Sequence, residues 1–130
     1  MTESLTDGVT LGIYEKALVG NRLATDDDWR RFLNQVPEAG FSFVDLSVDE
    51  SDERMARLGW EQNRRRMVRH CAEAAETVIG GVCLSVHRRI GPGSADPAVR
   101  QRARDVMAEG LRLCHDLGAP VLQVAGYYCY

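Results

Sequence analysis

The feature that most constrains the fold is a regular alternation of short apolar runs with longer amphipathic stretches. Four apolar runs typical of buried β-strands cover residues 10–13, 41–48, 77–85 and 121–125. Each intervening stretch is long enough to hold a helix, and parallel neighbours need such a crossover connection. The order therefore predicts an α/β fold with a parallel four-stranded sheet, built as β-α-β-α-β-α-β. Either a doubly wound sheet or part of a barrel would fit this order.

The three intervening stretches carry helix signals. In the first, large apolar residues recur at the spacing i, i+3, i+4 and i+7, as on one helix face: Trp29, Phe32, Leu33 and Val36. The second helix is expected over residues 60–75. Its predicted inner side consists of Met67, Cys71 and Ala74. The third helix should start at the N-cap Asp96, followed by Pro97, and end at the C-cap Gly118.

Length and charge limit the function classes. With 130 residues, the chain has room for one domain, expected over residues 1–130. A net charge of −3 argues against nucleic acid as a partner, so an arginine-rich stretch, Arg64 to Arg66 with Arg69, is interpreted as a solvated helix face. No apolar run approaches the roughly 18 residues of a membrane span, so a cytoplasmic location without membrane contact is expected. The four cysteines form no C-x-x-C pair, which disfavours a zinc site.

Polar residues follow all four predicted strands. They are Tyr14-Glu15-Lys16, Asp49-Glu50, His87-Arg88-Arg89 and Gly126-Tyr127. In a barrel, this edge of the sheet carries the chemistry. Alternatives stay open: Glu15 and Lys16 could form a surface ion pair, and residues 49–53 could be a solvated loop that caps the next helix. The paired arginines after His87 favour an anionic group.

Four stretches together resemble a known family. The segments are LGIYEKAL at residues 11–18, GFSFVDLSVDE at 40–50, CLSVHRR at 83–89 and VAGY at 124–127. They are similar to the four opening strands of the L-ribulose-5-phosphate (or L-xylulose-5-phosphate) 3-epimerases. These enzymes are grouped with the hexulose-6-phosphate isomerases and share the xylose isomerase-like barrel. The resemblance implies that the chain is the N-terminal half, strands one to four, of a (β/α)₈ TIM barrel.

The resemblance also implies a reaction and its division between the two halves. Family members move a proton beside the carbonyl of a phosphorylated ketose through a metal-stabilised enediolate. Carboxylates and a histidine hold the divalent metal, and two glutamates exchange the proton. These residues belong to the second half, so no catalytic residue, metal ligand or cofactor is expected in this chain. The positions expected to bind substrate are Glu15, Glu50, His87, Arg88, Arg89 and Tyr127.

Three further expectations follow from the missing half. The chain by itself should show no epimerase activity, even with added divalent metal. Its open sheet edges and bare inner face should make it a homo-oligomer or the partner of a complementing C-terminal half. The alternative function is a non-catalytic half-barrel that self-associates or binds a phosphosugar. If the site assignment holds, His87 and at least one arginine guanidinium should point into the concavity above the strand ends.

Overall fold

Parallel strands form the base of the molecule. The computed structural model describes residues 8–18, 23–124 and 126. Within these residues, one parallel sheet has the strand order β1-β2-β3-β4. Its strands are β1 (Gly12–Tyr14), β2 (Phe43–Ser47), β3 (Val78–Cys83) and β4 (Val121–Gln123). The predicted α/β fold with parallel strands is thus confirmed, although each strand is shorter than the apolar run that predicted it.

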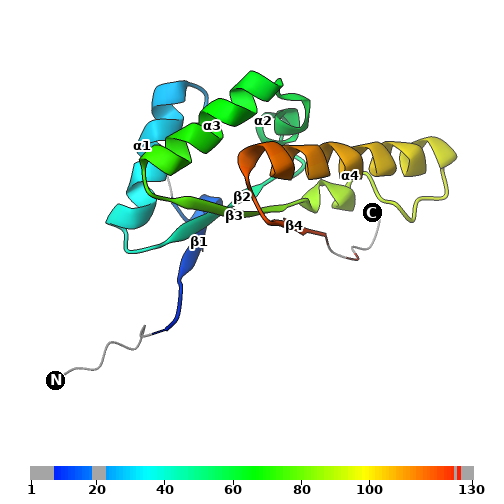
Figure 1. Ribbon diagram of the computed structural model, residues 1–130. Coiled ribbons are helices and arrows are strands. Elements are labelled where there is room, and N and C mark those ends of the chain that lie inside the picture. The colour runs from blue at the N-terminus through cyan, green and yellow to red at the C-terminus, as the bar shows by residue number, and fades with distance from the viewer. Residues whose placement is uncertain (1–7, 19–22, 125, 127–130) are drawn as a thin grey trace.

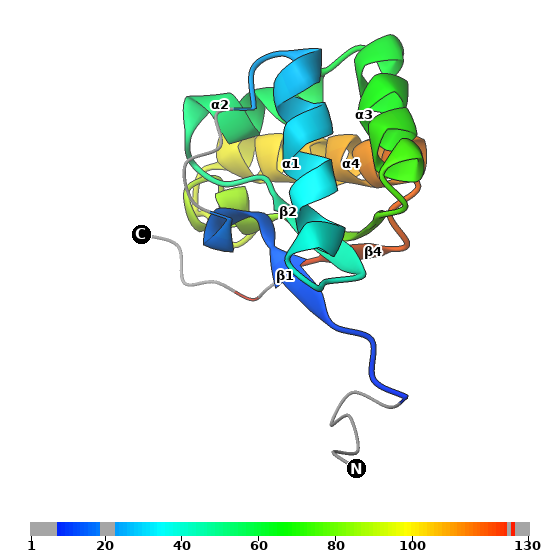
Figure 2. The ribbon, with the colours of Figure 1, turned by 90° about the vertical axis from the view of Figure 1, so that its left-hand side faces the viewer.

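Three long helices cover one face of this sheet. They are α1 (Asp26–Glu38), α3 (Gln62–Ala74) and α4 (Pro97–Leu117), and they lie on the same side of the strands in both views (Figures 1 and 2). No helix of the described chain covers the opposite face, which in a closed barrel would point inward. The arrangement is that of a half barrel with its helical layer in place.

The first helix forms as its sequence predicts. All four predicted apolar residues, Trp29, Phe32, Leu33 and Val36, are fully buried. Thr25 caps the start, because its hydroxyl accepts from the Asp28 backbone N–H at 3.2 Å while the Asp28 carboxylate accepts from the Thr25 N–H at 2.8 Å. This reciprocal capping box satisfies two N–H groups that a helix start leaves unpaired.

The second predicted helix, expected over residues 60–75, is found as α3, which starts two residues later than predicted. Residues 52–55 form a short helix, α2 (Asp52–Met55), and a 3-10 turn, η2 (Ala56–Gly59), follows before α3 begins at Gln62. The inner side also differs from the prediction, since Cys71 is buried as expected but Met67 is only partly buried and Ala74 is exposed. The buried stripe of α3 consists of Arg65, Val68, Cys71 and Ala72.

Arg65 corrects the interpretation of the arginine-rich stretch as a solvated face. Its side chain is buried between α3 and α4, where it donates to the Asp116 carboxylate at 3.1 Å and to the Leu58 carbonyl at 2.9 Å. Burial of the Arg65 charge is tolerated because two nitrogens of its guanidinium donate hydrogen bonds to acceptor oxygens. Arg64 pairs with Asp26 at 2.8 Å and therefore joins α3 to the start of α1.

The last helix keeps both predicted ends. The Asp96 carboxylate caps it by accepting from the Ala98 N–H at 2.8 Å, and Pro97 is its first residue. Gly118 ends it with a φ of +71°, a left-handed conformation that costs glycine little.

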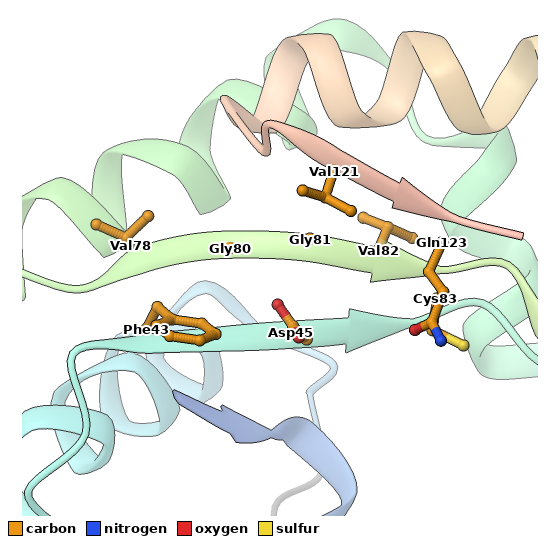
Figure 3. A pocket seen from close by; sticks show the side chains of 9 residues that line it. All are labelled: Phe43, Asp45, Val78, Gly80, Gly81, Val82, Cys83, Val121 and Gln123. Carbon is orange, nitrogen blue, oxygen red and sulfur yellow. The ribbon is translucent and has the colours of Figure 1, made fainter. Parts of the chain in front are cut away.

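The helix-free face is shaped by Phe43 and the glycines beside it. A Cβ at Gly12 would overlap the Phe43 ring, and one at Gly80 would lie 2.6 Å from it. Both glycines therefore give room for the ring, which explains Gly80 inside β3. Asp45 lies on the same face, and the register of β2 against β3 shifts beside it. Figure 3 shows these side chains around a shallow hollow of about 320 Å³.

Candidate functional site

The candidate site is the edge of the sheet where the strands end. The 3-10 turn η1 (Glu15–Ala17) follows β1 directly, and η3 (Ser85–Arg88) follows β3 after one residue. Between them, the loop after β2 leads to α2, whose N-cap Ser51 accepts from the Arg54 N–H at 3.4 Å. Because the strands are parallel, all three segments meet at the same edge. We call this edge, residues 15–16, 49–57 and 85–89, the rim.

Glu15 is the most enclosed carboxylate of the rim. One oxygen, Oε1, accepts from the Ser47 backbone N–H at 2.7 Å, from Arg57 Nη1 at 2.8 Å and from Arg54 Nε at 3.1 Å. The other, Oε2, accepts from Arg57 Nη1 at 3.0 Å. The alternative of a surface ion pair between Glu15 and Lys16 is therefore wrong, since Glu15 is buried and has other partners.

Arg57 is a rim residue that sequence reasoning missed. Its guanidinium also donates to the Ser47 carbonyl at 3.0 Å, and it lies 5.2 Å from the Trp29 ring centre and 5.9 Å from that of Trp60. Cation–π contact with two indoles helps to compensate the cost of burying the charge. The only sequence signal was an arginine three positions before a tryptophan, Trp60, which is too common to single out.

Asp49 is the second enclosed carboxylate of the rim. Its carboxylate contacts Lys16 Nζ at 2.5 Å and accepts from the Ser51 N–H at 2.9 Å and hydroxyl at 2.5 Å, while Arg54 Nη1 lies 3.6 Å away. Burial alone would raise the pKa of Asp49, but the hydrogen bonds from Lys16 and Ser51 outweigh it and lower the pKa to about 2. The loop does cap a helix, as one alternative held, but Asp49 itself is buried.

The structure separates the other predicted substrate contacts. His87 is buried, and its Nε2 lies 3.1 Å from the Ala103 carbonyl oxygen in α4. Its ring therefore faces the helical layer, and the expected orientation into the concavity is not found for this residue. Arg88 and Arg89 are exposed at the end of η3, and Glu50 is partly buried beside Asp49. Tyr127 lies outside the described residues. Substrate binding by these side chains stays a prediction.

The rim does not fit a divalent metal. Among the described residues, no group of three His, Cys, Asp or Glu side chains is placed to hold a metal ion. The two enclosed carboxylates, Glu15 and Asp49, are already neutralised by arginine and lysine side chains. A metal would have to displace these cations, so no reaction step is assigned to a metal held by these residues. Within the same part of the chain, no helix has the length and apolar character needed to cross a membrane.

Comparisons with known proteins agree with this architecture. Residues 33–130 match the family model described as "Xylose isomerase-like TIM barrel". A curated Escherichia coli K12 protein named "Putative L-ribulose-5-phosphate 3-epimerase SgbU" is 47% identical over 122 residues, which cover 92% of this chain and 40% of that protein. L-ribulose-5-phosphate 3-epimerase UlaE of Salmonella heidelberg is 38% identical over 126 residues, 97% of this chain and 43% of its own length. The chain thus spans about two fifths of these relatives.

Solved structures support the same fold. A D-psicose 3-epimerase from Clostridium cellulolyticum H10, crystallised with D-tagatose, superposes with a TM-score of 0.63 at 17% identity. The match covers 85% of this chain and 35% of that structure. At this identity the likeness shows the fold alone, and the coverage is that of a half barrel.

Proposed function

We propose that this chain, which belongs to the xylose isomerase-like TIM-barrel family, supplies the first half of the barrel of a sugar-phosphate 3-epimerase. The proposed reaction interconverts L-ribulose 5-phosphate and L-xylulose 5-phosphate. The observation that carries the proposal is high identity, over nearly the whole chain, to relatives with that name. The charged rim at the strand ends supports it, because barrel enzymes bind their substrates there.

The reaction requires a proton to leave C3, next to the C2 carbonyl, and a proton to return to the opposite face. The electron pair of the broken C–H bond passes into an enediolate and returns when the new bond forms, so no oxidant or reductant is consumed. In the complete family enzymes a divalent metal stabilises that negative charge. The side chains of this chain orient the substrate, and the acid/base groups and metal ligands come from the remaining strands.

The predicted substrate contacts divide into two groups. We assign direct contact to Arg88 and Arg89, which are exposed at the rim, and to Glu50 beside Asp49. Buried Glu15 and His87 instead fix the ends of β1 and β3 through their hydrogen bonds. Tyr127 is assigned to substrate binding on the family resemblance alone.

Complementation tests this function. The chain would be purified alone and together with a polypeptide that carries the remaining strands of a UlaE relative. Conversion of L-ribulose 5-phosphate to L-xylulose 5-phosphate would then be followed with added Mn²⁺, Mg²⁺ or Zn²⁺. We expect no turnover by the chain alone and metal-dependent turnover by the complex. Turnover by the chain alone would show that the groups in this half suffice and would contradict the division of roles.

A second candidate function is a non-catalytic half-barrel that self-associates or binds a phosphosugar. Apolar side chains on the helix-free face favour it, since Tyr14, Val78 and Val121 are exposed there and Phe43 is only half-buried. A self-associating half-barrel would form stable oligomers that bind the complementing half weakly and do not turn over substrate. The complementation experiment therefore separates the two functions.

A further inference from the structure

One carboxylate on the helix-free face has no partner. Asp45 lies in the middle of β2, and its side chain is partly buried in the hollow that Figure 3 shows. The residues that line this hollow include no basic side chain. Within the described part of the chain, no hydrogen bond or ion pair joins the Asp45 carboxylate to another group. Burial raises the pKa of Asp45, and no nearby cation opposes this effect.

The backbone around Asp45 holds its carboxylate against β3. The register of β2 against β3 shifts at Asp45, so that Asp45 is paired with Gly81 and Gly80 is passed over. Irregularities of this kind re-aim a side chain. Cβ atoms at Gly80 and Gly81 would lie 2.9 and 3.4 Å from Asp45 Oδ1. The two glycines therefore leave room for the carboxylate directly over the strand.

Closure of the barrel would change the surroundings of this carboxylate. The helix-free face becomes the interior of a closed barrel, which packed layers of side chains fill. Removal of an ionised carboxylate from water is unfavourable unless a cation and hydrogen-bond donors take the place of the water. Whatever covers the face must therefore either pair with Asp45 or leave it protonated.

The charge of the face distinguishes between two possible partners. A second copy of this chain would bring a second Asp45 into the same covered space, and the residues that line its hollow would again include no basic side chain. Association of two copies through their apolar side chains would thus leave both carboxylates without a cation. A barrel half of different sequence can supply that cation, and it should bind more tightly than a second copy.

We propose that Asp45 is a recognition residue for the remaining half of the barrel, which presents a basic side chain to it inside the closed sheet. This inference rests on the proposed function, because it takes the partner to be the remaining strands of the same barrel. The exposed apolar side chains of Val78 and Val121 supply attraction that is not selective. The carboxylate supplies selectivity, since a partner without a cation leaves a covered charge unpaired.

The competing explanation is that Asp45 enters the barrel as a neutral acid. The two explanations predict opposite effects of pH on assembly. If a cation pairs with Asp45, assembly lowers its pKa, and the affinity between the halves increases as the pH rises. If Asp45 is covered in its protonated form, assembly raises its pKa, and the affinity decreases as the pH rises. Tyr14 and Cys83 are the other titratable side chains on this face, and an Asp45→Asn variant retains both.

Calorimetric titration of the chain with a polypeptide that carries the remaining strands of a UlaE relative tests the proposal. Between pH 4 and 7, the wild type should bind more tightly as the pH rises, and Asp45→Asn should lose that part of the pH dependence. At pH 7, Asp45→Asn should weaken binding by about tenfold or more, the loss expected for a hydrogen bond to a charged group. Asp27→Asn, which alters an exposed carboxylate on α1, is the matched control and should bind as the wild type.

The stability of the uncomplexed chain serves as a second readout. Asp45→Asn should stabilise the chain alone at pH 7, because ionisation of a carboxylate whose pKa is raised by burial opposes folding. Weaker binding by this variant would therefore not arise from a loss of folded protein. A variant that loses stability and affinity together would assign Asp45 to the fold of this half and would contradict a role in recognition.

Other results would also overturn the proposal. They are an absence of binding between the wild type and the remaining strands, equal or tighter binding by Asp45→Asn, or a wild-type affinity that decreases as the pH rises. Failure of the proposed function would look different, because the halves would assemble in a manner that depends on Asp45 and yet not epimerise L-ribulose 5-phosphate. Conversely, an active complex whose assembly is unaffected by Asp45→Asn would remove this inference and leave the function standing.

Discussion

Arg57 Nη1 donates to both carboxylate oxygens of Glu15, at 2.8 and 3.0 Å, and each side chain is 2% exposed. The pair connects the end of β1 to η2, 42 positions farther along the chain. The Ser47 backbone takes part through its N–H to Glu15 and its carbonyl to Arg57. One buried pair therefore fixes the ends of two neighbouring strands and the turn that leads to α3.

Replacement of Arg57 by methionine should destabilise the chain strongly. The substitution leaves the Glu15 carboxylate buried without its main partner, and removal of one member of a buried pair costs about 3–5 kcal/mol. Urea denaturation would measure the loss in the free energy of unfolding. Arg30→Met is the control, since its exposed pair with Asp27 should contribute less than about 1 kcal/mol. Equal losses in the two variants would contradict a structural role for the buried pair.

The double variant Glu15→Gln, Arg57→Met completes this test. A neutral glutamine side chain in place of the Glu15 carboxylate needs no cation, so the double variant should lose less stability than the sum of the two single losses. The difference in a double-mutant cycle reports the interaction between the two side chains. Additive losses would mean that Glu15 and Arg57 stabilise the fold independently of each other.

Two aspartates should give opposite dependences of stability on pH. Hydrogen bonds overcome the effect of burial and lower the pKa of Asp49 to about 2, below the value of about 4 in an unfolded chain. Its contribution to stability is therefore present above pH 4 and lost as the pH falls towards 2. Burial raises the pKa of Asp45, so ionisation of this group opposes folding as the pH rises.

Asparagine substitutions test these signs. Asp49→Asn should destabilise the chain near neutral pH and reduce the further loss of stability between pH 4 and pH 2. Asp45→Asn should stabilise the chain at pH 7. Thermal unfolding followed by circular dichroism between pH 2 and 7 would compare both variants with the wild type. A stabilising Asp49→Asn or a destabilising Asp45→Asn at pH 7 would show that the surroundings of that carboxylate are misassigned.

Alanine at Gly12 should displace the Phe43 ring from the helix-free face. The added Cβ would overlap the ring, so the ring must move. Overpacking of this kind costs about 1–3 kcal/mol. Gly93→Ala is the control, because a Cβ there meets nothing within 4 Å. Chemical denaturation would compare the two variants, and equal stability would indicate that Phe43 has another accessible position.

The chain by itself should associate through its helix-free face. Val78 and Val121 are both exposed on this face, and contiguous exposed apolar surface favours association. Sedimentation velocity at micromolar concentration should detect dimers or larger species. Val121→Lys should shift the distribution towards monomers, while Leu111→Lys on α4 is the matched control, since Leu111 is equally exposed there. A monomeric wild type would contradict this account of the face.

The sequence predicted those elements whose signals are local. The stripe from Trp29 to Val36 and the caps at Asp96 and Gly118 depend on spacing and on backbone preferences of single residues, and both were confirmed. The start of α3 was predicted two residues too early because Trp60 continues the apolar periodicity, although it adopts an extended conformation at the end of η2. Periodicity alone does not distinguish a helical residue from an apolar one just before the helix.

The rim was predictable only in part. Parallel strands bring their ends together, so the sequence could place Glu15, Asp49 and His87 at one edge. Which side chains pair could not be deduced, because the partners of Glu15 are 39 and 42 positions away, in a stretch for which no element was predicted. The orientation of His87 depends on a backbone carbonyl of α4, a partner that residue types do not reveal.

Solvent exchange at C3 tests the central claim most directly. The chain, assembled with the remaining strands of a UlaE relative and a divalent metal, would be incubated with L-ribulose 5-phosphate in D₂O and followed by ¹H NMR. Proton transfer at C3 predicts that the C3 proton signal disappears as deuterated L-xylulose 5-phosphate forms, while the chain alone leaves the spectrum unchanged. A well-folded complex that retains the C3 proton and forms no L-xylulose 5-phosphate would contradict the assignment of this half barrel to a 3-epimerase.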